Sequence, residues 1–119
     1  MASDVRVDVL AEIPLACSLS SDELRERGVE NAALFACAHT VRELADGYSF
    51  AFAAGAAMAG DLLAFVQAEA ACCPFFTFEL AFPSPHQTIW LTVRGREGVK
   101  DIVRESVASK LIAAAGSAA

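Results

Sequence analysis

The stretch "TFELAFPSPHQTIWLTV", residues 77–93, carries two alternating apolar patterns separated by a turn sequence. Alternation of apolar and polar residues is typical of a strand with one buried face. The apolar residues that share that face are Phe78, Leu80, Phe82, Ile89, Leu91 and Val93. The segment PSPHQ between them is rich in turn residues, so we expect a hairpin connection. These residues therefore predict an antiparallel strand pair packed against a core.

Two further segments before this hairpin show the same alternation. Tyr48, Phe50 and Phe52 predict another strand. In residues 5–19 the odd positions are apolar, which predicts one or two extended segments with that side inward. Pro14 cannot donate a ladder hydrogen bond and implies an edge or a break there.

Three segments show helical signals. Ser20 and Glu23 form a capping-box pattern for a first helix, which we expect to end at Gly47 in "ADGYS". The apolar side of this helix would contain Leu24, Ala32, Phe35, Ala36 and Val41. We read "AAGAAMAGD" as a turn, with Asp61 capping a second helix that runs to Cys73. The third helix is predicted from residues spaced three and four apart, which are Val99, Ile102, Val103, Val107 and Leu111.

The predicted order is β-α-β-α-β-β-α. It indicates the α+β class: a two-layer sandwich with a largely antiparallel sheet of about four strands and helices on one face. At 119 residues the chain, 1–119, is expected to be a single domain, with residues 112–119 as a frayed tail.

The composition excludes several classes of function. A net charge of −6 without a basic stripe argues against nucleic-acid binding. The most apolar stretch is interrupted by Gly55, Gly60 and Asp61, so no membrane span is expected. The N-terminus shows no secretory signal, and four cysteines without one indicate reduced thiols in the cytoplasm.

Trp90, Thr92 and Arg94 fall on the other side of the last strand. Trp90 is then either a partly covered surface residue or a contact to a second subunit in a homodimer.

The stretch "EAACCPFF", residues 69–76, contains the candidate site. Helical spacing places Glu69, Cys72 and Cys73 on one face, the face that also carries Phe65. Pro74 ends the helix directly after the cysteines. We therefore expect Glu69 to be buried and hydrogen-bonded. Its partner would be either backbone N–H groups near Cys17 or Ser18, or an arginine from the first helix such as Arg27.

Cys17 has the same inward parity as its neighbours and would meet Cys72 or Cys73, giving three thiols beside one carboxylate. Cys37 is read as core filling on the first helix, with His39 facing away from it. His86 is read as a solvated loop histidine, or alternatively as a base that reaches the thiols. The competing interpretation is that the cysteines act only as small apolar residues, because adjacent cysteines do not match Cys-x-x-Cys spacing.

The chain also resembles a family of small uncharacterised bacterial proteins with a Glu-x-x-Cys-Cys-Pro-Phe motif. The matching residues are Cys17, Leu19, Gly47, Tyr48, Glu69, Cys72, Cys73, Pro74, Phe75, Phe78, Gly95, Gly98 and Lys100. The resemblance covers most of the chain and implies a loose association with heavy-metal handling. It brings no established activity.

Three functions follow as hypotheses. In the first, Cys17, Cys72 and Cys73 bind a soft ion such as mercury(II), arsenite, copper(I) or zinc, with Glu69 as a fourth ligand or a hydrogen-bond acceptor beside it. In the second, the protein is a thiol-based redox enzyme with Cys72 or Cys73 as nucleophile and Glu69 as proton carrier. In the third, it is a structural dimer whose cysteines only fill the core.

Overall fold

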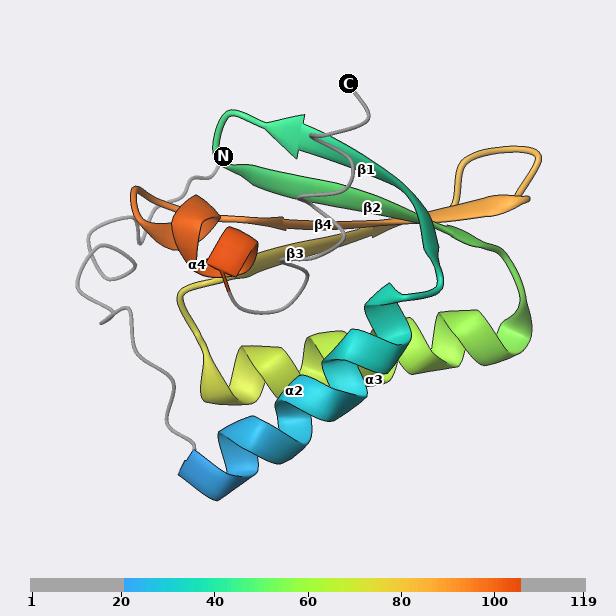
Figure 1. Ribbon diagram of the computed structural model, residues 1–119. Coiled ribbons are helices and arrows are strands. Elements are labelled where there is room, and N and C mark those ends of the chain that lie inside the picture. Colours follow the sequence, from blue (N-terminus) through green and yellow to red (C-terminus); the bar gives the residue numbers. More distant parts are fainter. Residues whose placement is uncertain (1–20, 106–119) are drawn as a thin grey trace, which may run out of the picture.

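The computed structural model describes residues 21–105, which form three helices and four strands (Figure 1). In chain order these are α2 (Ser21–Phe35), β1 (Ala38–Leu44), β2 (Gly47–Ala53), α3 (Ala56–Cys72), β3 (Thr77–Ala81), β4 (Thr88–Arg94) and α4 (Val99–Glu105). Within this range the strands make one antiparallel sheet in the order β1-β2-β4-β3. The predicted α+β class and largely antiparallel sheet are confirmed. The expected segments at 5–19, the cap at Ser20, Val107, Leu111 and the tail lie outside the described residues.

The face of β2 and β4 that packs on the helices is the one that alternation predicted, whereas Phe82 lies after the end of β3 and is exposed, contrary to the prediction. Phe50 of β2 lies opposite Leu91 of β4, and both are fully buried. Phe35, at the end of α2, makes an edge-to-face contact with Phe50, with ring centroids 4.8 Å apart. Such aromatic pairs contribute about 0.5–1.5 kcal/mol beyond the burial of their area. The core therefore lies between the sheet and the helices, and α2 and α3 cross below the sheet in Figure 1.

The first helix is shorter than predicted. It ends at Phe35, and residues 38–44, which we expected to be helical, form the edge strand β1. Gly47 does not cap a helix: it is the first residue of β2, after a tight connection from β1. A Cβ on Gly47 would lie 2.0 Å from the carbonyl oxygen of Val93, so glycine is required by the close approach of β4.

The second helix is longer than predicted. It begins at Ala56, within the segment that we read as a turn, so Asp61 is an exposed residue inside α3 and not its cap. Alanine has the strongest intrinsic helix propensity, and Met58 and Ala59 pack against the core. These contributions outweigh the cost of Gly60 in a helix interior, about 1 kcal/mol relative to alanine.

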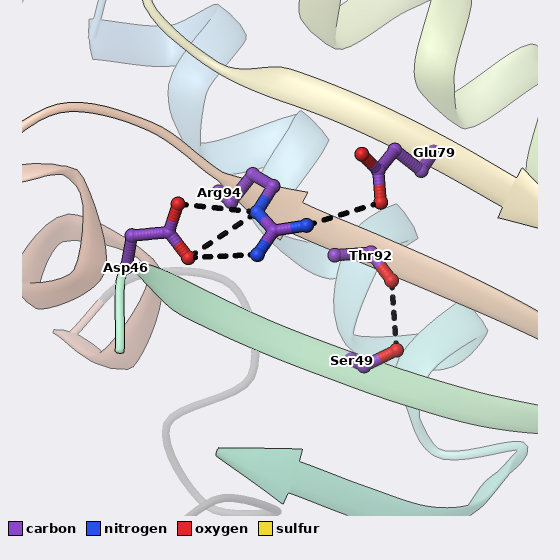
Figure 2. Close-up of polar contacts among 5 residues, drawn as sticks. All are labelled: Asp46, Ser49, Glu79, Thr92 and Arg94. Carbon is purple, nitrogen blue, oxygen red and sulfur yellow. Dashed lines mark hydrogen bonds and ion pairs between the residues drawn. The ribbon is translucent and has the colours of Figure 1, made fainter. Parts of the chain in front are cut away.

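The opposite face of the sheet carries polar contacts (Figure 2). Arg94 lies between Asp46 and Glu79 and donates hydrogen bonds to both carboxylates. The hydroxyls of Ser49 and Thr92 are 2.8 Å apart. On the same face the guanidinium of Arg42 lies over the half-buried ring of Trp90, 4.3 Å from its centroid. The predicted assignment of Trp90, Thr92 and Arg94 to this face is confirmed.

No helix within residues 21–105 is both long and apolar enough to cross a membrane.

Candidate functional site

The C-terminal half of α3 presents a buried face that includes a carboxylate. The buried residues of this helix are Leu62, Phe65, Glu69 and Cys72, spaced three or four apart as the sequence predicted. Only 5% of the surface of Glu69 is exposed. Rotating this face to solvent would expose the apolar residues on either side of Glu69, so the carboxylate is held in the interior by its own helix.

Two side chains from α2 donate hydrogen bonds to Glu69. Nη2 of Arg27 lies 2.6 Å from Oε2, and Nδ2 of Asn31 lies 3.2 Å from the same oxygen. The prediction that Glu69 is buried and bound by an arginine of the first helix is therefore confirmed. The alternative partners near Cys17 and Ser18 lie outside the described residues. Asn31 was not predicted, although it follows Arg27 by four residues and so shares its face of α2.

Helix α3 ends at the cysteine pair. The N–H of Cys73 donates the last helical hydrogen bond to the carbonyl of Glu69, at 2.7 Å, and Cys73 itself has left helical geometry. Pro74 has no N–H with which to continue the helix. Sγ of Cys72 and Sγ of Cys73 lie 3.5 Å apart. A disulfide bond is about 2.05 Å long, so these are two thiols.

Glu69, Cys72 and Cys73 together form a cluster of three ligand atoms. One carboxylate oxygen and the two sulfurs all lie within 4.8 Å of one another, and all three residues are buried. Thiolates prefer soft ions, and a carboxylate oxygen can complete their coordination. The donor set therefore fits a thiophilic ion. Three of the four predicted site residues are brought together, while the fourth, Cys17, lies outside the described residues.

The other candidates lie elsewhere. Cys37 is exposed in the connection between α2 and β1, so its interpretation as core filling on a helix was wrong. His39 is an exposed residue of β1, and its Nδ1 is 2.9 Å from the hydroxyl of Thr40. His86 is an exposed residue of the loop between β3 and β4. β3 begins shortly after α3 ends at Cys72, and the loop with His86 follows the other end of β3. This loop therefore lies at the far end of the sheet from Cys72 (Figure 1).

A groove of about 500 Å³ lies between α2 and α3 and is lined by residues of both helices. Arg27 and Asn31 line it, together with apolar side chains that include Leu34 and Phe65. Among the described residues, those that line the groove do not include Glu69 or the two buried cysteines. The groove therefore reaches the donors of Glu69 but not the thiols, and the donor set of the cluster is the better indication of chemistry.

Comparisons with protein-family models, with curated proteins and with solved structures found no match to this chain. The fold and the cluster together define a small α+β protein with a buried Glu-Cys-Cys site.

Proposed function

We propose that the protein binds a thiophilic metal or metalloid ion at Glu69, Cys72 and Cys73. The observation that carries the proposal is the cluster itself: three ligand atoms of suitable chemistry lie within 4.8 Å of one another in the interior. Core filling would explain two buried thiols, but it does not explain a buried carboxylate beside them, because burial of a carboxylate is unfavourable unless it has partners such as Arg27 and Asn31. Ion binding accounts for all three residues.

Each residue has a separate part in this proposal. Cys72 and Cys73 supply the sulfur ligands. Arg27 and Asn31 fix Glu69 by their bonds to Oε2, so that the carboxylate is held beside the sulfurs. Cys17 is the proposed third thiolate, on the basis of its inward parity in the sequence. The thiols must be reduced to bind, so the proposal includes a reducing compartment, the cytoplasm. The resemblance to a family associated with heavy-metal handling supports the same function.

Titration of the reduced full chain tests the proposal. Arsenite, zinc, mercury(II) and copper(I) are added separately, and uptake is read from the intact mass and from thiolate-to-metal absorbance. We expect one ion per chain, with binding lost in Cys72→Ser and in Cys73→Ser. Cys37→Ser is the matched control, because Cys37 is exposed and outside the cluster, and it should bind as the unmodified chain does. If the reduced chain takes up none of the four ions, the proposal is contradicted.

A thiol-based redox enzyme is the second candidate. The 3.5 Å separation of the two sulfurs favours it, since one thiol could resolve an intermediate formed on the other. The burial of both thiols disfavours it, because reactive cysteines are at least partly exposed. We therefore expect Cys72 and Cys73 to be alkylated more slowly than the exposed Cys37 in the folded protein. Alkylation of either one faster than Cys37 would favour the enzyme over the ion-binding protein.

A further inference from the structure

The distance between the two sulfurs selects among soft ions. If an ion lies about 2.3 Å from each sulfur, the length of a zinc–thiolate bond, a separation of 3.5 Å gives an angle of about 100° at the ion. Ions that prefer linear two-coordination, such as copper(I) and mercury(II), would need the sulfurs about 4.6 Å apart at the same bond length. Trivalent arsenic and antimony carry a lone pair and bind three donors as a pyramid, with angles close to a right angle. The sulfur pair fits the pyramid.

Tetrahedral zinc also accepts a similar geometry, with sulfurs about 3.8 Å apart, so the number of donors must separate it from a metalloid. Structural zinc takes four protein ligands, whereas the cluster offers three ligand atoms among the described residues. One of the three, the carboxylate of Glu69, already accepts hydrogen bonds from Arg27 and Asn31. The described donor set therefore favours a metalloid that keeps a hydroxyl of its own.

A neutral hydroxide needs only the two thiols as protein ligands. Arsenite at neutral pH is the uncharged acid As(OH)3, and it exchanges hydroxyls for thiols: As(OH)3 + 2 RSH → (RS)2As–OH + 2 H2O. Two S–H and two As–O bonds break, and two As–S and two O–H bonds form. The thiol protons leave as part of water, arsenic stays trivalent, and the net charge of the site does not change.

We infer that the ligand of this site is a trivalent metalloid hydroxide of the arsenite class, bound by Cys72 and Cys73. This inference rests on the proposed function and narrows it to one class of ion. In this narrower form the third position carries the hydroxyl of the metalloid in place of the Cys17 thiolate proposed above. Glu69, fixed by Arg27 and Asn31, is the acceptor for that hydroxyl.

The test compares the folded chain with a peptide of residues 66–77, which carries the same two thiols and the same carboxylate without the fold. Dissociation constants for arsenite, zinc and mercury(II) are measured on both under reducing conditions. Because the fold holds the sulfurs at the pyramidal angle before binding, it should tighten arsenite binding at least tenfold relative to the peptide. Zinc and mercury(II) should gain less.

Two outcomes would contradict different claims. If mercury(II) or zinc gains as much from the fold as arsenite does, the metalloid inference is wrong while the ion-binding function stands. If the folded chain takes up none of the three ions, the proposed function itself fails. Cys37→Ser controls for thiol number: its arsenite affinity should stay within twofold of the unmodified chain, and a larger loss would place arsenic outside the Cys72–Cys73 site.

Discussion

Replacing Arg27 with methionine should leave Glu69 as a buried carboxylate with Asn31 as its remaining donor on α2. Breaking a buried ion pair by removing one partner costs about 3–5 kcal/mol. The side chain of Arg27 is 22% exposed, so water can reach part of the vacated space. We therefore expect a loss of about 3 kcal/mol in the free energy of unfolding at pH 7.

Urea unfolding of Arg27→Met and of the unmodified protein at pH 7 measures this loss. Glu30→Gln is the control: Glu30 is exposed and 3.8 Å from Arg27, and its removal should cost less than about 1 kcal/mol. A loss for Arg27→Met below about 1 kcal/mol at pH 7 would refute the buried pair.

Three further predictions concern the core, the sheet face and association. Leu62 is fully buried, so Leu62→Ala should lower the free energy of unfolding by about 3 kcal/mol in urea titrations, and a loss below about 1 kcal/mol would contradict its place in the core. Hydrogen bonds from Arg94 lower the pKa of Asp46, so this pair stabilises the fold above the ordinary carboxyl pKa and its contribution is lost as the pH falls through the lowered pKa. Arg94→Gln should therefore lower the melting temperature at neutral pH but not at about pH 2, and an equal loss at both would count against it. If a homodimer covers Trp90, the fluorescence emission of Trp90 should shift to the red when the protein is diluted until it is monomeric. Sedimentation as a monomer at high concentration would exclude the homodimer.

The sequence predicted the central strands correctly because their burial is periodic. In β4 the inward residues Ile89, Leu91 and Val93 alternate with half-buried ones, and no bulge interrupts the pairing with β2. β1 was missed for a physical reason. Its residues that are not exposed are Ala38, Val41 and Leu44, which are spaced three apart and so imitate a helix. A register shift between Ala38 and Thr40, and the exposure of an edge strand, remove the alternation that would have identified it.

The candidate site was predictable where it depends on one helix. Glu69 and Cys72 follow Phe65 at helical spacing, and Pro74 ends the helix, so their common burial could be read directly from the sequence. The contribution of α2 was only partly predictable. Arg27 was expected because a buried carboxylate needs a cation, whereas Asn31 lies beside Glu69 only because of how α2 crosses α3, which helical periodicity does not determine. Cys37 was misplaced because its environment depends on the end of α2 at Phe35.

The most direct test of the ion-binding site is a crystal structure of the reduced full chain grown with arsenite, with arsenic located by its anomalous scattering. We predict arsenic within bonding distance, about 2.3 Å, of both sulfurs of Cys72 and Cys73, with Glu69 still bound to Arg27. Arsenic at Cys37 alone, or both buried thiols without arsenic at a saturating concentration, would contradict it.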